Sequence, residues 1–189
     1  MNFVKNVATL LAPGEPLLVR KAVRGDKEAF GKLYLKYLDG IYRYIFFKVR
    51  QDGEVAEDLA QEVFLKAFKK INGFNRREGT FKAWIYRIAR NHTIDYFKKI
   101  NGRIGLSIEV VDKKENPEER LVIKSEYERL IAAINKLTKV QRDVVILHHV
   151  NDLTNAEVAK LLMRNEEAIR AIKYRALKNL KRIYGQNDK

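Results

Sequence analysis

The sequence predicts an all-α protein of two small helical domains joined by a flexible linker, the second domain carrying a helix-turn-helix. Apolar residues recur every three or four positions, and no strand-like alternation persists. Proline is absent between residues 17 and 100, whereas residues 101–120 lose the helical period. We therefore divide the 189 residues into an N-terminal extension (1–16), a first domain (17–100), a linker (101–120) and a second domain (121–189).

The first domain is expected to consist of amphipathic helices separated by short polar breaks. One long helix is indicated by an apolar series at helical spacing, namely Ala29, Leu33, Tyr37, Ile41, Ile45 and Val49. Breaks are predicted around Gly25 and Gly53, because glycine beside aspartate favours a turn. A longer break covers residues 72–79, and Thr80 after it is a candidate N-cap for the next helix.

The segment 57–70 is predicted to be a helix with one apolar face and one acidic face. The acidic face carries Asp58, Gln61 and Glu62, with Leu65 among them. Two interpretations remain open: a solvated surface with a stray leucine, or a docking face with an apolar anchor for a basic partner. Acid–base catalysis is the weakest interpretation, because no burying pocket or metal-ligand set is indicated.

The segment GTFKAWIYRIARNHTIDYFKK, residues 79–99, is predicted to be one helix with two kinds of surface. Its core positions are Phe81, Ile85, Ile88 and Ala89. A second stripe at helical spacing mixes a ring, an amide, a carboxylate and cations, at Trp84, Arg87, Asn91, Asp95 and Lys98. A buried core does not require this second stripe.

The second domain is expected to end in a pair of helices joined by a short turn. Thr154 with Glu157 forms a predicted capping box, Met163 lies in the turn, and Asn165 caps the last helix. Inward positions in the first helix of the pair are Val158, Ala159 and Leu162. The last helix has a buried stripe at Ile169, Ile172, Ala176, Leu180 and Ile183. Its other surface is strongly basic, which suits a DNA major groove or a solvated bundle helix.

The charge balance narrows the classes of partner. Lys and Arg number 38 against 24 Asp and Glu, and the sequence pI is near 9.9, which points to nucleic acid or an anionic membrane surface. The absence of cysteine excludes disulfides and thiolate metal sites. His92, His148 and His149 are interpreted as helix-surface residues, so no metal and no cofactor is expected. The start of the chain is a poor signal peptide, so the expected location is the cytoplasm.

The order of these motifs resembles a bacterial RNA polymerase sigma factor of the extracytoplasmic-function group of the sigma-70 family. The resemblance covers about residues 17–184 and rests on LVRKAVRGDKEAFGKLY, EDLAQEVFLKAF, FKAWIYRIARNHTIDYFKK and the helix-turn-helix. It implies two helical domains, regions 2 and 4, which bind core RNA polymerase and promoter DNA. Promoter opening would then draw on binding energy, so the resemblance implies a protein that is not an enzyme.

The resemblance also implies roles for individual residues. Contacts with the clamp coiled coil of the largest polymerase subunit would come from Asp58, Gln61, Glu62 and Leu65. The unpaired −10 strand would contact Phe74, Arg76, Arg77, Trp84, Arg87, Asn91, Asp95, Lys98 and Lys99. The −35 duplex would contact Asn165, Glu167, Arg170, Lys173, Tyr174, Arg175, Lys178 and Lys181. Rings and amides among cations suit an unpaired strand, since they can contact bases while the cations hold phosphates.

Further implied partners are the flap region of the polymerase and an anti-sigma factor. Met163 stands where the family's turn often has glycine, and Ala168 and Ile172 replace a common threonine and arginine, which leaves the −35 sequence unpredicted. Asp95 can accept a hydrogen bond from a base amine but would repel phosphate. Two other classes remain as alternatives: a stand-alone helix-turn-helix regulator with a two-fold operator, and a basic membrane-surface or scaffold protein.

Overall fold

The computed structural model describes residues 14–49, 52–104 and 126–185. Regular structure in these residues is helical and includes no strand, which confirms the predicted all-α class. Most of the predicted N-terminal extension (1–16) and of the predicted linker (101–120) lies outside the described residues. The chain divides into two compact units, and the boundary falls inside one helix, between His92 and Thr93. Each unit is considered by itself, and that helix is described with the first unit.

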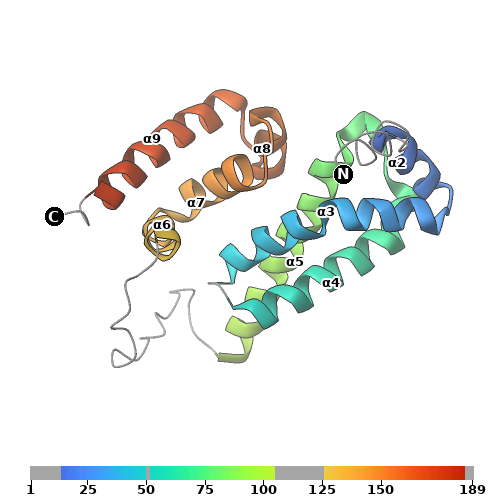
Figure 1. Cartoon of the computed structure of the whole chain (residues 1–189), viewed down its shortest axis with the longest axis horizontal. Helices are drawn as coiled ribbons and strands as arrows, with labels where there is room; N and C mark the ends of the chain where they lie inside the picture. Colours follow the sequence, from blue (N-terminus) through green and yellow to red (C-terminus); the bar gives the residue numbers. More distant parts are fainter. Residues whose placement is uncertain (1–13, 50–51, 105–125, 186–189) are drawn as a thin grey trace, which may run out of the picture. The chain divides into compact units, whose positions relative to one another are not determined.

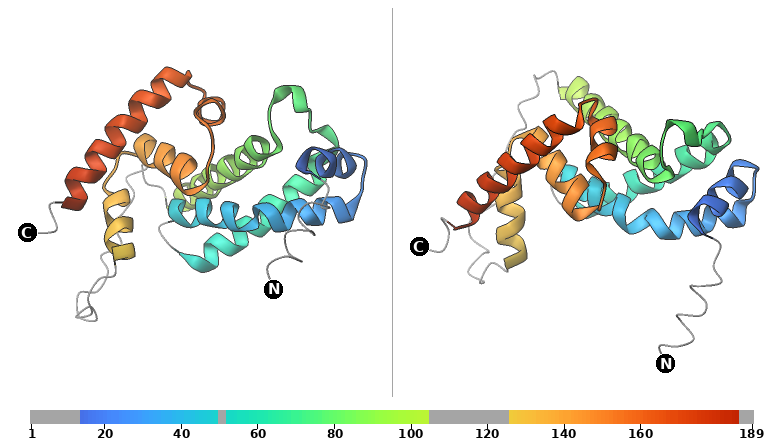
Figure 2. Two further views of the ribbon diagram at one scale, coloured as in Figure 1. Left: turned by 45° about the horizontal axis from the view of Figure 1, so that its top comes forward. Right: turned by 90° about the horizontal axis from the view of Figure 1, so that it is seen from above.

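The first unit begins with α2 (Glu15–Val23), α3 (Lys27–Lys48) and α4 (Gly53–Lys70). Helices α3 and α4 run antiparallel and lie side by side (Figures 1 and 2). An aspartate caps each of them: Asp26 accepts from the amide of Ala29 at 2.9 Å, and Asp52 accepts from that of Val55 at 3.1 Å. The helix ends therefore fall at the breaks predicted around Gly25 and Gly53.

Two short 3₁₀ turns, η1 (Ile71–Gly73) and η2 (Arg76–Glu78), connect α4 to α5 (Phe81–Ile104). Thr80 caps α5, its hydroxyl accepting from the amide of Ala83 at 3.1 Å. Helix α5 extends to Ile104, past the predicted start of the linker at residue 101. A single helical glycine costs only about 1 kcal/mol, so Gly102 does not end the helix.

The core of the first unit joins α3, α4 and α5. All six residues of the predicted apolar series from Ala29 to Val49 are buried, and the buried apolar face of α4 consists of Leu59, Ala60, Val63, Phe64 and Ala67. Tyr44 of α3 and Tyr86 of α5 meet edge-on with ring centroids 5.8 Å apart. The hydroxyl of Tyr37 donates to Glu15 at 2.7 Å and ties α2 to α3. These contacts fix the faces that α4 and α5 turn outward.

The second unit contains α6 (Glu126–Asn135), α7 (Lys139–Val145), a π turn η4 (Ile146–Val150), α8 (Asn155–Leu162) and α9 (Glu166–Gly185). Capping boxes begin α7 at Thr138 and α8 at Thr154. Helix α9 contacts α6, α7 and α8, and its Ala176 packs with Leu137 and Val145. The inward position at the end of α8 is Leu161, and Leu162, which the sequence placed inward, is half-buried.

The π turn η4 was not expected from the sequence. The backbone amide of Asn151 donates to the carbonyl of Ile146 at 3.1 Å, five residues back, which is one residue more than in an α-helix. The Asn151 side-chain amide donates to the same carbonyl at 3.1 Å, and this side chain is buried. A buried asparagine with two such bonds stabilises a turn that apolar periodicity cannot reveal.

The turn between α8 and α9 places a bulky residue in a left-handed conformation. Met163 has φ 53° and ψ 51° and is 85% exposed. This conformation costs a residue with a Cβ atom about 1–2 kcal/mol, and glycine avoids the cost. The turn keeps its shape because the amide of Arg164 donates to the carbonyl of Ala159 at 2.9 Å.

We expect Met163→Gly to raise the free energy of unfolding by about 0.5–1 kcal/mol, since relief of the strain exceeds the added entropy of the unfolded chain. The measurement is the urea midpoint of the full chain. Ala171→Gly, at an exposed position within α9, is the matched control and should lower stability by about 1 kcal/mol. An unchanged or lower midpoint for Met163→Gly would contradict the strain assigned to this turn.

Candidate functional site

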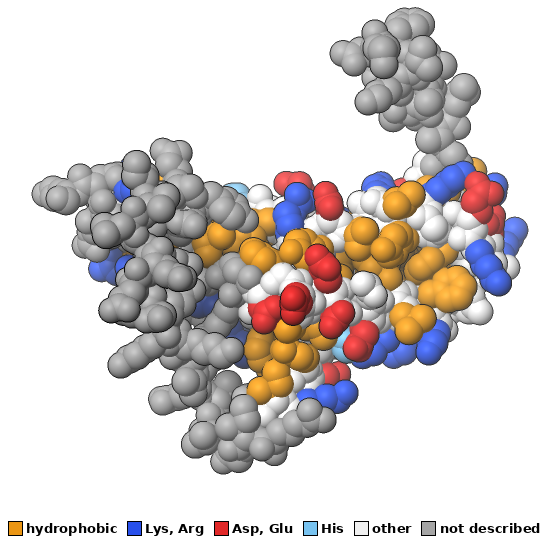
Figure 3. Space-filling model, turned by 60° about the horizontal axis from the view of Figure 1, so that its bottom comes forward, with side chains coloured by type: hydrophobic (Ala, Val, Ile, Leu, Met, Phe, Trp, Pro, Cys, Tyr) orange, Lys and Arg blue, Asp and Glu red, His pale blue; other side chains and the backbone are white. Residues whose placement is uncertain are grey.

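The four predicted docking residues of α4 form one exposed surface, which we call the α4 face: Asp58, Gln61, Glu62 and Leu65. Leu65 is 54% exposed and has an apolar neighbour that the sequence analysis missed, Phe68, which is 42% exposed. Phe68 could have been predicted from the sequence as part of this surface, because it follows Leu65 by three positions and so lies on the same side of the helix. In Figure 3 exposed hydrophobic side chains lie beside carboxylates on one side of the molecule.

A buried histidine lies behind the α4 face. His92 of α5 places its Nε2 atom 2.9 Å from Oε2 of Glu62, and its Nδ1 atom 2.5 Å from Nζ of Lys66. The prediction that His92 is a helix-surface residue is therefore wrong: the ring is 6% exposed. Sequence periodicity misplaced it because the apolar edge of the ring can enter a core when both nitrogens meet polar partners.

The loop before α5 is organised around three rings. Phe74 meets Phe81 and Trp84 edge-on, with centroids 5.9 and 5.4 Å apart. Phe74 is buried, so this predicted strand-contacting residue supports the loop from inside, while Trp84 is only half-buried. Arg76 and Arg77 project from the loop and are exposed.

Gly79 closes this loop with φ 147°, a backbone conformation that side chains with a Cβ atom rarely adopt.

The mixed stripe predicted along α5 lies on the helix surface. Arg87, Asn91, Asp95, Lys98 and Lys99 are all exposed, while Phe81, Ile85 and Ala89 are buried. At 100° per residue, Asn91 and Asp95 lie within one narrow strip above Trp84. The helix therefore presents an amide, a carboxylate and cations in a row that begins at a half-buried ring.

The outer surface of α9 contains most of the predicted duplex-binding residues. The predicted residues within α9 that are exposed are Glu167, Arg170, Tyr174, Arg175, Lys178 and Lys181. Arg170 is paired with Glu166 one turn earlier at 3.3 Å. Asn165 caps the helix, accepting from the amide of Ala168 at 2.7 Å. The exposed residues other than Arg175 form one continuous face, with Tyr174 at its centre and Arg170 and Lys178 at its two sides by helical geometry.

Lys173 lies at the edge of that surface and is engaged within the protein. Its ammonium contacts Nε2 of His148 at 3.0 Å and donates to Oδ1 of Asn155 at 3.3 Å. The pKa of His148 is lowered from its usual value, first by burial and then by the nearby positive charge of Lys173. Lys173 therefore ties α9 to the π turn and to α8.

This arrangement makes the stability of the protein depend on pH. Because the folded protein lowers the pKa of His148, the unfolded chain binds the proton more readily, and stability falls as pH drops below about 6.5. We expect the urea midpoint of the full chain to be lower at pH 5.5 than at pH 7.5. His148→Gln should reduce that difference, and an equal difference in the variant would contradict the assignment.

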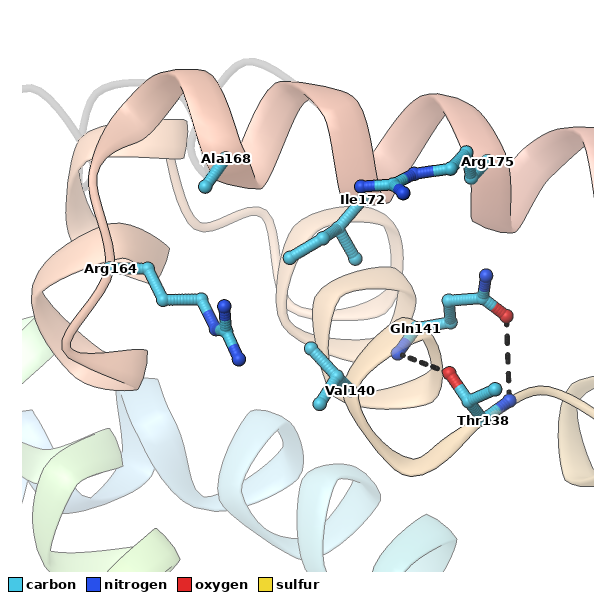
Figure 4. A pocket seen from close by; sticks show the side chains of 7 residues that line it. All are labelled: Thr138, Val140, Gln141, Arg164, Ala168, Ile172 and Arg175. Atoms are coloured by element: carbon cyan, nitrogen blue, oxygen red, sulfur yellow. Dashed lines mark hydrogen bonds between the residues drawn. The ribbon is translucent and has the colours of Figure 1, made fainter.

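A pocket of about 290 Å³ lies between α7 and the start of α9, at the other edge of the surface. Figure 4 shows Val140, Arg164 and Ile172 pointing toward the same space, with Ala168 above it. Ala168 and Ile172, which depart from the resembled family, are half-buried here. These two residues therefore line the pocket and lie away from the outer face of α9.

Other kinds of site find no support in the part of the chain that the structure describes. In residues 14–49, 52–104 and 126–185, no group of three or more histidine, cysteine, aspartate or glutamate side chains could hold a metal ion. No helix among these residues is both long enough and apolar enough to span a membrane.

Both units match models of one protein family. Residues 33–103 match Sigma-70 region 2, and residues 127–180 match Sigma-70 region 4. The chain is 31% identical over 164 residues to the ECF RNA polymerase sigma factor SigX of Bacillus subtilis, covering 82% of this chain and 84% of that protein. The chain belongs to the sigma-70 family of RNA polymerase sigma factors, in its extracytoplasmic-function (ECF) group.

Other relatives agree with this assignment. The ECF sigma factor BldN of Streptomyces coelicolor is 36% identical over 170 residues, which cover 88% of this chain but only 64% of BldN. Among solved structures, CnrH in complex with the cytosolic domain of CnrY matches with a TM-score of 0.70 at 20% identity, covering 92% of this chain and 99% of that one. Bartonella quintana RpoE, in complex with the anti-sigma factor NepR, matches with a TM-score of 0.65 at 23% identity, covering 82% and 95%. These two structures support the fold alone.

Proposed function

We propose that this sigma factor binds core RNA polymerase through the α4 face, holds an unpaired −10 strand along α5 and its preceding loop, and binds the −35 duplex with α9. The observation that carries the proposal is the separation of surface chemistry on adjacent helices. The α4 face combines carboxylates with Leu65 and has Phe68 beside it, whereas α5 presents a ring, an amide and cations. The first surface suits a basic protein partner and the second suits a nucleic acid strand.

On this proposal, promoter opening uses binding energy and the chain catalyses no reaction itself. Taking a base out of the stack costs a few kcal/mol, which contacts with the α5 stripe can repay. Cations along α5 hold the backbone, and Asn91 supplies a donor and an acceptor to a base edge. The cytoplasm is the proposed place of action, and an anti-sigma factor is a proposed competitor for the α4 face.

The function is tested by adding the purified chain to core polymerase and a promoter library. Transcription from start sites that core polymerase alone does not use supports the proposal. Specific binding to a two-fold duplex site, without any new start site, would instead favour a stand-alone helix-turn-helix regulator.

For the −35 duplex, we expect Lys178→Ala or Lys181→Ala to reduce the salt dependence of promoter binding by about one unit of slope each. Arg170→Ala should change the sequence preference more than either lysine substitution does, because Arg170 lies in the first turns of α9, which reach base edges. Lys173→Ala should mainly lower stability, because its ammonium already bonds to Asn155. Salt titrations and a promoter selection measure these effects. Equal slopes for Lys178→Ala and the parent would contradict the phosphate assignment.

A further inference from the structure

His92 of α5 contacts two charged side chains of α4, Glu62 and Lys66. Glu62 and Lys66 are four residues apart on α4, so their side chains are neighbours one turn apart. The imidazole ring of His92 stands between them, 2.9 Å from the Glu62 carboxylate and 2.5 Å from the Lys66 ammonium. The ring is buried, whereas Glu62 is exposed on the α4 face.

The chemistry of these partners fixes which nitrogen carries the proton. A lysine ammonium has only donors, so Nδ1 of His92 must be the acceptor in that contact. A neutral imidazole that accepts at Nδ1 carries its proton on Nε2, and Nε2 lies 2.9 Å from the Glu62 carboxylate, close enough for electrostatic attraction although not aligned as a hydrogen bond. The three side chains therefore form a series of close polar contacts, hydrogen-bonded at Nδ1 and electrostatic at Nε2, which ends at the protein surface.

Removing the ring would change the orientation of the carboxylate. A glutamate four residues before a lysine on a helix is the favourable order for a direct ion pair. Without the ring between them, Glu62 and Lys66 can pair along α4, which turns the carboxylate away from the direction it now holds. The buried histidine therefore opposes a local ion pair that the sequence of α4 alone would favour.

We propose that His92 is a positioning residue for polymerase binding, which holds the Glu62 carboxylate in the outward orientation that the partner recognises. The inference rests on the proposed function of the α4 face. His92 acts through Glu62, because its own ring is too buried to contact a partner.

Two substitutions separate positioning from packing. His92→Leu keeps an apolar side chain of similar size and removes both polar contacts, whereas His92→Gln offers a carbonyl to Lys66 and an amide N–H to Glu62. We expect His92→Leu to weaken the affinity of the full chain for core polymerase by about tenfold. His92→Gln should recover most of that loss. Thermal melting followed by circular dichroism checks the fold of each variant, and His92→Asn, too short to reach both partners, replaces the leucine variant if that variant does not fold.

A double-mutant cycle with Glu62→Gln completes the test. If His92 acts through Glu62, His92→Leu should cause no further loss of affinity in the Glu62→Gln protein. Additive losses, or equal affinities for the leucine and glutamine variants at position 92, would overturn the positioning role. If Glu62→Gln weakens binding while His92→Leu does not, only the role of His92 is wrong. If Glu62→Gln leaves the affinity unchanged, the docking function of Glu62 is wrong and the role of His92 falls with it.

Discussion

Replacing Asn91 with alanine is expected to reduce open-complex formation on a duplex promoter by roughly 5- to 150-fold, the equivalent of about 1–3 kcal/mol of lost base contact. Asn91 is exposed near the middle of the α5 stripe, where its amide can donate to one base edge and accept from another. Permanganate reactivity of the −10 thymines, at matched protein concentrations, measures the opening.

Two controls distinguish base contact from loss of fold. A template already mismatched at −10 removes the cost of melting but keeps the base contact, so it should rescue Asn91→Ala only in part. Ile85→Ala removes a fully buried side chain, costs about 2–5 kcal/mol of stability and should fail equally on both templates once the protein unfolds. Full promoter melting by a folded Asn91→Ala protein would contradict this role of Asn91, and the bases would then have to be recognised by the loop at residues 73–80.

The double substitution of Leu65 and Phe68 by alanine is expected to weaken core polymerase binding by at least about thirtyfold, near 2 kcal/mol. These two side chains are the apolar part of a face otherwise made of carboxylates and an amide, and apolar anchors commonly dominate such interfaces. The measurement is the dissociation constant for core polymerase without DNA.

Leu35→Ala is the matched control, because Leu35 is 73% exposed on α3, outside the α4 face. It should leave the affinity close to that of the parent. The ring of Phe68 also packs edge-on against that of Phe30, with centroids 5.0 Å apart, so its removal affects the core. The single substitution Leu65→Ala therefore tests the anchor with little effect on packing. Equal losses for Leu35→Ala and Leu65→Ala would mean that the contact is not specific to the α4 face.

Much of the fold could be predicted from the sequence because it depends on local signals. Helix starts at Thr80, Thr138, Thr154 and Asn165 follow from side chains that accept a hydrogen bond from the backbone a few residues ahead, and the structure has all four bonds. The buried series along α3 follows from apolar periodicity alone. Each of these features involves residues that are close in sequence.

The features that sequence patterns missed depend on contacts between residues distant in the chain. The burial of His92 depends on Lys66 and Glu62, which lie 26 and 30 positions earlier and contact its two ring nitrogens. The side chain of Lys173 is held at the edge of the outer face because its ammonium contacts His148 and donates to Asn155. The resemblance assigns Phe74 to the −10 strand, which stays a prediction, and the sequence did not reveal that its ring packs with Phe81 and Trp84. Periodicity describes one helix at a time and carries no information about partners on another helix.

The π turn at Ile146–Val150 has a consequence for how relatives of this protein are compared. Such a turn accommodates one residue more than a regular helix, so deleting one residue there would restore the α-helical pitch. A relative that lacks this residue can therefore close the turn as regular α-helix, with little change in the direction of the chain that follows. The orientation of α8 and α9 relative to α7 is thus compatible with either length. A one-residue gap at residues 146–150 in an alignment of relatives would mark the presence or absence of the wide turn, and it would not by itself mean that the last two helices point in another direction.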